Sequence, residues 1–156
     1  MSTRPRRLLI LCSGNICRSP MAHGMAEAHA RHSDTAMEVR SAGTLMIEGA
    51  PADRRAIRVC EEVGLDITAH RSQGLTAELV TWADRILVME MAHAMAVRQM
   101  CPEIGEDKLH LLGGFIGLTN IEDPIRSWFI GPFRTARSEI SEALSRFFSY
   151  WDSTGT

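Results

Sequence analysis

The sequence has no long apolar run. Every apolar stretch falls well short of the roughly 20 residues that span a bilayer, so no membrane segment is predicted. Residues 8–12 follow three arginines, but this apolar run is shorter than the about 7–15 residues in the apolar region of a secretory signal. We therefore expect a cytoplasmic protein with no membrane partner, in which the four cysteines are reduced.

The chain also lacks an excess of charge, internal repeats, low-complexity segments and linkers. Its formal net charge is −2, which gives no general basic field, so nucleic acid is not expected as a partner. The dense basic run at residues 4–7 is expected to be solvated, with residues 1–6 forming a flexible arm. A length of 156 residues without a linker predicts a single domain over residues 1–156.

Apolar periodicity predicts strands that alternate with helices. Strands are predicted at residues 7–11, 37–42, 85–89 and 108–112, and helices at 21–28, 53–63, 91–100 and about 136–151. This alternation predicts an α/β domain with a parallel sheet and right-handed crossovers. Ligands bind beyond the carboxyl ends of such strands. Cys12 and Ser41 lie at two of these ends and the segment after Leu112 leaves a third, so we expect them to meet at one edge.

Residues 12–20, Cys-Ser-Gly-Asn-Ile-Cys-Arg-Ser-Pro, connect the first predicted strand to the first helix. Gly14 permits a positive φ angle and Asn15 tolerates the left-handed region, so successive N–H groups can point inward as an anion site. Arg18 adds a planar guanidinium that matches two oxygens of a tetrahedral oxyanion. A helix N-terminus and a nearby arginine favour the thiolate form of a cysteine, which makes Cys12 the predicted nucleophile.

Two interpretations of this segment compete. Ser19 could cap the helix, or its hydroxyl could donate a hydrogen bond to the sulfur of Cys12. A buried cysteine beside a capping serine and a surface arginine would explain these residue types separately. The anion site is favoured because it explains all of them together.

The segment resembles the phosphate-binding loop of the low-molecular-weight protein tyrosine phosphatases. The similarity continues in the family's order through residues 41–44 (Ser-Ala-Gly-Thr), 69–71 (Ala-His-Arg), 88–90 (Val-Met-Glu) and 123–124 (Asp-Pro), and so covers nearly the whole chain. It implies a three-layer α/β/α domain with a four-stranded parallel sheet, and a Cys-x5-Arg loop between the first strand and the first helix. It also implies hydrolysis of phosphate monoesters without a metal or another cofactor.

The resemblance implies a role for each matching residue. Cys12 would attack phosphorus and form a cysteinyl-phosphate, Arg18 would hold the phosphate oxygens, and Asp123 would be the general acid. From its Asp-Pro context alone Asp123 is an exposed turn residue, and Glu122 is a neighbouring alternative acid. The other members of the phosphate-binding loop would be Ser13, Gly14, Asn15, Ile16, Cys17 and Ser19.

The resemblance also implies supporting roles for Ser41 and His70. These residues match members of a family network that would hold the side chain of Asn15 in place. In the family, a neighbour such as Cys17 can form a reversible disulfide with the nucleophile, which protects it from over-oxidation. Cys60 and Cys101 are expected to be packing residues. No metal site is predicted, because His29 and His32 share a helix but no third ligand is suggested.

The substrate prediction depends on where the chain departs from the family. Many members carry aromatic residues directly after Asp-Pro, where this chain has Ile125 and Arg126, and the loop after residue 44 carries Leu45-Met46-Ile47 in place of a larger side chain. Trp128 and Phe129 could replace the missing aromatic wall or belong to the core. The expected substrate rim comprises Met46, Ile47, Ile125, Arg126 and Trp128.

Phosphotyrosine in a protein is the predicted substrate, with inorganic phosphate and other tetrahedral oxyanions as inhibitors. Phosphoarginine is the alternative, but members that act on it tend to have Thr where this chain has Ile16. An arsenate reductase is disfavoured because residues 81–91 contain no cysteine. A non-catalytic phosphate-binding module is disfavoured because Cys12, Arg18 and Asp123 are all present.

Overall fold

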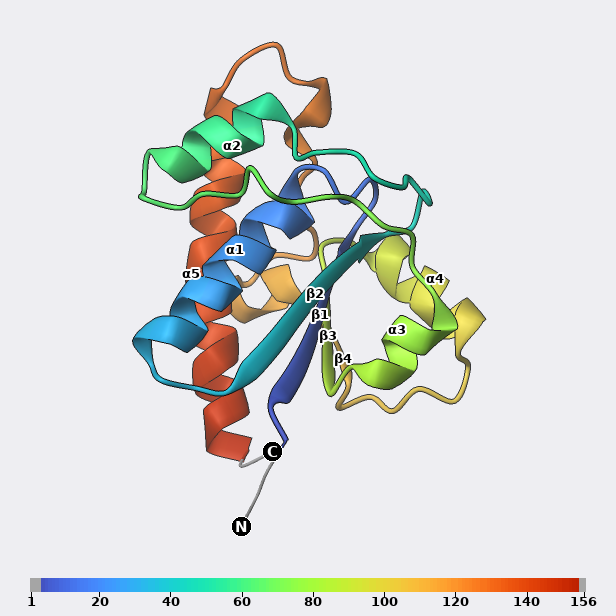
Figure 1. Ribbon diagram of the computed structural model, residues 1–156. Coiled ribbons are helices and arrows are strands. Elements are labelled where there is room, and N and C mark those ends of the chain that lie inside the picture. The colour runs from blue at the N-terminus through green and yellow to red at the C-terminus, as the bar shows by residue number, and fades with distance from the viewer. Residues whose placement is uncertain (1–3, 155–156) are drawn as a thin grey trace.

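The computed structural model, which describes residues 4–154, contains one four-stranded parallel sheet (Figure 1). The strand order is β2-β1-β3-β4, so that the first strand lies inside the sheet. The strands are β1 (Arg6–Cys12), β2 (Met37–Gly43), β3 (Arg85–Val88) and β4 (Leu109–Leu111). The four strands predicted from apolar periodicity are therefore confirmed, with boundaries that move by one residue.

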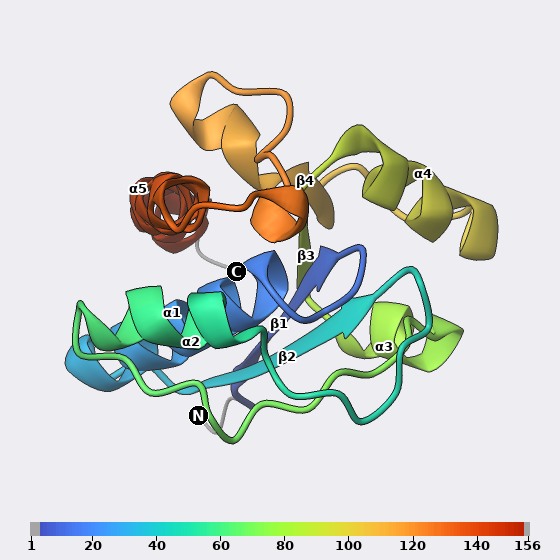
Figure 2. The ribbon, with the colours of Figure 1, turned by 90° about the horizontal axis from the view of Figure 1, so that it is seen from above.

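Helices cover both faces of the sheet and make three layers (Figures 1 and 2). Successive residues of a strand point to opposite faces. Leu8 and Ile10 accordingly pack against α1, α2 and α5, whereas Leu9 and Leu11 pack against α3 and α4. The helices are α1 (Arg18–His32), α2 (Arg54–Glu61), α3 (Ala77–Trp82), α4 (Met91–Met100) and α5 (Gly131–Thr154).

Four elements differ from the sequence-based expectation. Helix α3 has only 6 residues, too few to show a helical period, and Thr76 caps it by accepting a hydrogen bond from the Leu79 N–H. Two 3-10 helices, η1 (Leu112–Ile116) and η2 (Pro124–Arg126), were not predicted for the same reason. Helix α5 has 24 residues and is longer than the predicted four turns.

The N-terminal segment is attached to the fold where the structure describes it. Arg6 is the first residue of β1, and its guanidinium donates to Asp152 at 2.6 Å. The Arg4 guanidinium forms an ion pair with Asp84 at 2.6 Å. The predicted flexible arm therefore does not extend to these residues, and its first three residues lie outside the described part. Among residues 4–154, no helix has both the length and the apolarity needed to cross a membrane.

The parallel register brings the carboxyl ends of the strands to one edge. Cys12 pairs with Gly43 of β2, and Leu11 pairs with Val88 of β3. The backbone of β2 passes so close to the loop after Cys12 that a Cβ on Gly43 would lie 2.6 Å from the Ser13 carbonyl oxygen. This contact requires glycine at residue 43, and it places the segment after β2 beside the predicted anion site.

Candidate active site

The phosphate loop (residues 12–18) runs from the end of β1 to the first residue of α1. Asn15 takes the left-handed conformation, with φ of 57°, as its residue type allows. Gly14 is not among the residues with positive φ, so the left-handed turn falls on Asn15 alone. A Cβ on Gly14 would lie 3.3 Å from Ile16 Cγ1. The loop thus folds tightly over its own side chains.

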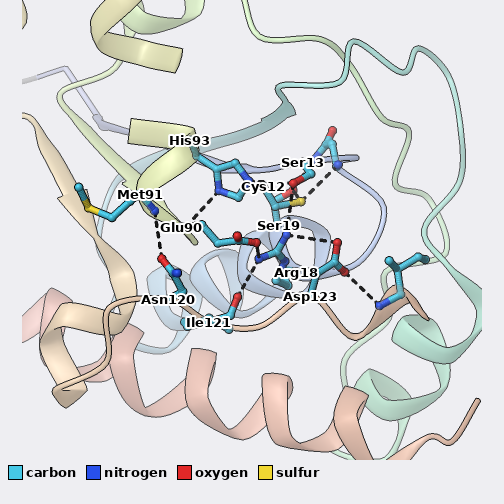
Figure 3. A network of polar contacts seen from close by, with 12 residues as sticks. Cys12, Ser13, Arg18, Ser19, Glu90, Met91, His93, Asn120, Ile121 and Asp123 are labelled. Atoms are coloured by element: carbon cyan, nitrogen blue, oxygen red, sulfur yellow. Dashed lines mark hydrogen bonds and ion pairs between the residues drawn. The ribbon is translucent and has the colours of Figure 1, made fainter. Parts of the chain in front are cut away.

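The sulfur of Cys12 accepts hydrogen bonds from two groups of this loop (Figure 3). The Asn15 N–H donates to Sγ at 3.2 Å, and Ser19 Oγ lies 2.9 Å from Sγ. Asn15 Nδ2 donates to Ser19 Oγ at 2.6 Å, so the hydroxyl proton of Ser19 is free to point at the sulfur. Ser19 therefore does not cap α1, whose N-cap is Cys17. Both donors are directed at the sulfur of Cys12.

Asn15 is held by the segment that follows α2. Its Oδ1 accepts from the Gln73 N–H at 3.0 Å, and His70 Nε2 donates to its main-chain oxygen at 2.7 Å. Ser41 does not bond to Asn15 in the described part of the chain; its Oγ bonds to His23 Nδ1 at 2.9 Å. The strained residue is thus fixed through its side chain and its carbonyl, and Ser41 belongs to the neighbouring contact with α1.

Arg18 is buried, with 1% of its surface exposed, and its guanidinium has several protein partners. Nη1 donates to the Glu90 carboxylate and to the Ile121 carbonyl at 2.7 Å. Within the described residues Nε is buried and has no hydrogen-bond partner. Glu90 follows Met89, just after the end of β3. Its carboxylate orients the guanidinium, and Nε stays available for an oxyanion. Sequence reasoning matched Glu90 to the family but assigned it no role.

Asp123 is a second carboxylate, besides Glu90, that contacts Arg18 of the phosphate loop. Its Oδ2 lies 3.4 Å from Arg18 Nη2, and its Oδ1 accepts from the Ile125 N–H at 3.0 Å. A third of its side chain is exposed, which leaves it open to a bound substrate. Glu122 is exposed, and burial, followed by the charge of Glu122, raises the pKa of Glu139 in α5. Of the two candidate acids, only Asp123 contacts Arg18 among the described residues.

A buried histidine that sequence reasoning missed lies against the phosphate loop. His93, in the first turn of α4, accepts the Glu90 N–H on Nδ1 at 3.1 Å, and its Nε2 lies 2.9 Å from Ser13 Oγ. Because Nδ1 is an acceptor, Nε2 carries the proton and donates to Ser13. Burial first, and then the Arg18 charge, lower the pKa of His93 to about 4. The imidazole is therefore neutral at neutral pH.

The lowered pKa of His93 predicts an acid-dependent loss of stability. Unfolding returns the imidazole to its ordinary pKa of 6.5, so between pH 6.5 and about 4 the unfolded chain binds more protons. Stability is then fully present above pH 6.5 and falls as the pH is lowered. From pH 7 to pH 4, His93 should remove about 3 kcal/mol of unfolding free energy.

Urea unfolding of the wild type and of His93→Gln, each at both pH values, measures this contribution. The wild type should lose about 3 kcal/mol more than the variant over that pH range. Equal losses would show that His93 takes up no proton on unfolding. Glutamine keeps a polar side chain at the site but does not titrate, which makes it the matched replacement.

The expected rim residues differ in exposure. Ile47 reaches the phosphate loop, since its Cδ1 lies 3.6 Å from a Cβ built on Gly14, and Met46 packs over Gly74. Ile125 is partly buried and packs against the core. Trp128 is 95% exposed and Phe129 is 76% exposed, so neither belongs to the core. Arg126 is also exposed.

The cysteines lie in the core or at its edge, and His29 packs on an aromatic ring. Cys12 and Cys17 are both free and buried, and burial raises the pKa of Cys17 above its usual range. Cys60 is fully buried, but Cys101 is only partly buried, at the edge of the core. His29 stacks on Phe148, with ring centroids 4.0 Å apart. Among residues 4–154, no three His, Cys, Asp or Glu side chains come together in a way that could hold a metal ion.

The chain is similar to known proteins over nearly its whole length. Residues 7–154 match the family described as low molecular weight phosphotyrosine protein phosphatase. A probable low molecular weight protein-tyrosine-phosphatase, EpsP of Ralstonia nicotianae, is 37% identical over 146 residues, which cover 94% of this chain and 93% of the relative. A protein-arginine-phosphatase of Geobacillus stearothermophilus is 37% identical over 147 residues, with coverage of 91% and 93%.

A solved structure extends the similarity to three dimensions. Wzb of Vibrio vulnificus, in complex with benzylphosphonate, has a TM-score of 0.82 at 36% identity and covers 91% of this chain and 96% of that chain. A phosphonate is a tetrahedral oxyanion, the kind of group that the phosphate loop is built to hold. By its sequence, its sheet and the loop between β1 and α1, this chain belongs to the low molecular weight phosphotyrosine protein phosphatase family, whose members are enzymes that act on phosphorylated substrates.

Proposed function

We propose that this protein hydrolyses phosphotyrosine in proteins, with Cys12 as nucleophile, Arg18 as oxyanion ligand and Asp123 as general acid. One observation carries the proposal. A sulfur with two hydrogen-bond donors, a buried guanidinium with an unpaired Nε and a carboxylate near that guanidinium all lie at the carboxyl edge of the sheet. This arrangement supplies a nucleophile, charge stabilisation and a proton donor together.

The first step forms a covalent intermediate. The Cys12 thiolate attacks phosphorus, an S–P bond forms, and the bond from phosphorus to the leaving oxygen breaks. The proton that this oxygen needs comes from the Asp123 carboxyl. Arg18 and the N–H groups of the phosphate loop hold the remaining phosphate oxygens, whose charge spreads in the transition state.

The second step releases phosphate. Water attacks phosphorus, the Asp123 carboxylate takes the water's proton, and the S–P bond breaks to restore the thiolate. The hydrogen bonds from Ser19 and Asn15 that stabilise the thiolate in the free enzyme also make sulfur a better leaving group here. The cycle consumes one water and leaves Asp123 protonated for the next substrate.

Phosphoarginine is the second candidate, because a relative at 37% identity is named a protein-arginine-phosphatase. Residue 16 is the feature that favours phosphotyrosine. Ile16 packs against the core cluster under α1 and presents an apolar side chain in the phosphate loop, where it also lies close to Gly14. An apolar wall suits an aromatic ester, whereas a hydroxyl at this position could hydrogen-bond a guanidino leaving group.

The two substrates can be compared directly with phosphotyrosine and phosphoarginine peptides of the same sequence. We expect kcat/KM to favour phosphotyrosine, and Ile16→Thr to shift the ratio toward phosphoarginine by about fivefold, since one added hydrogen bond contributes about 1 kcal/mol. Ile16→Val is the matched control, because it shortens the side chain without adding a hydroxyl. A wild-type preference for phosphoarginine, or an equal ratio in both variants, would contradict this assignment.

The rim proposal rests on two segments, the one after β2 and the one that carries Asp123. Ile47 borders the loop directly, Met46 lies beside it, and Trp128 stands on the segment that carries Asp123. A tryptophan that is 95% exposed has a large apolar surface to offer to the protein around a phosphorylated residue. We propose Trp128 and Ile47 as substrate contacts.

A cytoplasmic location is also part of the proposed function, supported by four cysteines that are all free.

A further inference from the structure

Arg55, in the first turn of α2, contacts the segment that carries Asp123. This segment, residues 121–129, is called the Asp-Pro segment below. Arg55 Nη1 donates to the Ser127 carbonyl at 2.6 Å, and Nη2 donates to the Ile125 carbonyl at 3.1 Å. Its guanidinium also lies over the ring of Phe133, 4.3 Å from the centroid. One side chain of α2 therefore holds two carbonyl groups of the Asp-Pro segment, in and directly after η2.

Asp53 connects the same guanidinium to the phosphate loop. Its two carboxylate oxygens accept from Arg55 Nε and Nη2, each at 3.1 Å, and its Oδ1 caps α2 through the Arg55 N–H. The main-chain N–H of Asp53 donates to the Ile16 carbonyl at 2.7 Å. Asp53 and Arg55 thus form one hydrogen-bonded unit, with the phosphate loop on one side and the Asp-Pro segment on the other.

The connection to Asp123 passes through a single residue. Ile125 donates its N–H to Asp123 Oδ1 at 3.0 Å and accepts from Arg55 with its carbonyl. On the other side of Asp123, the Ile121 N–H is paired with the Met89 carbonyl at 2.9 Å. Asp123 is therefore fixed from Met89, directly after β3, on one side and from α2 on the other.

We propose that Arg55, oriented by Asp53, is a positioning residue that sets the place of the Asp123 carboxyl above the phosphate loop for proton transfer to the leaving group. The proposal rests on the role of Asp123 as general acid. Proton transfer depends steeply on the distance between donor and acceptor, so a small shift of Ile125 should affect the acid more than it affects anion binding. A lysine cannot replace the fork, because a single ammonium cannot bridge Asp53 and two carbonyls in one plane.

A leaving-group comparison tests this proposal. Phenyl phosphate releases a basic phenoxide that needs a proton, whereas 2,4-dinitrophenyl phosphate releases a weakly basic one that does not. For Arg55→Lys, kcat/KM should fall about 10–100-fold with phenyl phosphate and less than about 3-fold with the dinitrophenyl ester. The measured quantity is kcat/KM, because it reports the steps up to departure of the first product.

The variants Arg55→Gln and Arg134→Gln complete the set. Arg55→Gln keeps a polar side chain and one donor group, and serves if the lysine variant folds poorly. Arg134 also bridges the end of α2 and α5, through Glu62 at 2.7 Å, but among the described residues it has no hydrogen bond to the Asp-Pro segment; its main-chain N–H donates to the carbonyl of Ile130, which follows that segment. Arg134→Gln should leave the ratio between the two esters unchanged.

A double variant decides whether Arg55 acts through Asp123. In an Asp123→Asn background, Arg55→Lys should cause no further fall with phenyl phosphate, because the acid is already absent. Equal falls with both esters for Arg55→Lys, or an additional fall in the double variant, would overturn the proposal. If Asp123→Asn itself were insensitive to the leaving group, the acid role of Asp123 would fail, and the role of Arg55 with it.

Discussion

Replacing Cys12 with serine is expected to abolish hydrolysis of p-nitrophenyl phosphate, with a fall in kcat of at least about 10⁴-fold. The reason lies in the hydrogen bonds of the site. The Asn15 N–H and Ser19 Oγ are placed to stabilise a negative charge on sulfur at 3.2 Å and 2.9 Å. A serine hydroxyl stays protonated there, because the described residues provide no general base in contact with residue 12. Steady-state kinetics measures the loss.

Anion binding provides the control for the Cys12 variant. Arg18 and the loop N–H groups remain in Cys12→Ser, so calorimetry should still detect inorganic phosphate with an affinity within about tenfold of the wild type. Retained binding with lost turnover identifies an enzyme whose nucleophile has been removed. Turnover by Cys12→Ser within tenfold of the wild-type rate would contradict the role of the sulfur.

Asp123→Asn is expected to have the second largest effect, a fall in kcat/KM for phenyl phosphate of about 10²–10⁴-fold. Asparagine can keep the hydrogen bond from the Ile125 N–H but cannot deliver a proton. The wild type needs a thiolate and a protonated Asp123 together, so its activity should follow a bell-shaped curve with an acidic optimum. In Asp123→Asn the decline on the alkaline side should disappear.

Glu122→Gln is the matched control for this measurement. Glu122 is adjacent in sequence but is exposed and has no contact with Arg18 among the described residues, so its replacement should leave both the rate and the pH profile unchanged. A wild-type activity that rises steadily through about pH 9 would show that no protonated acid is required. A larger effect in Glu122→Gln than in Asp123→Asn would reassign the acid to Glu122.

The supporting residues of the site differ in how far the sequence could predict them. His70 was expected to support Asn15, and it does contact Asn15, although through the main-chain oxygen. Glu90, His93 and Arg55 were given no role, since each reaches the site from a distant part of the chain. Glu90 contacts Arg18 across 72 residues and His93 contacts Ser13 across 80. A pattern of neighbouring residues in the sequence cannot reveal contacts between residues that are so far apart in the chain.

The substrate rim also contains a residue whose position the sequence alone did not fix. Trp128 could be a core residue or a surface residue by its sequence context, because a tryptophan near the start of an amphipathic helix fits both. The structure leaves it exposed because α5 begins only at Gly131 and buries Phe133 as its first apolar residue. Ser19 also had two possible roles, and the choice depended on the side chain of Asn15, which supplies a hydrogen bond to its oxygen.

The sheet and the phosphate loop can be predicted from local sequence. Apolar runs or alternation define the strands, and the loop is made of consecutive residues whose backbone preferences and side chains act on one another directly. The surroundings of that loop depend on the tertiary structure: Glu90 on the Arg18 guanidinium, His93 on Ser13 and Arg55 behind Asp123. These contacts arise where the ends of different strands and helices meet, and the packing of the three layers, which no single segment encodes, sets their geometry.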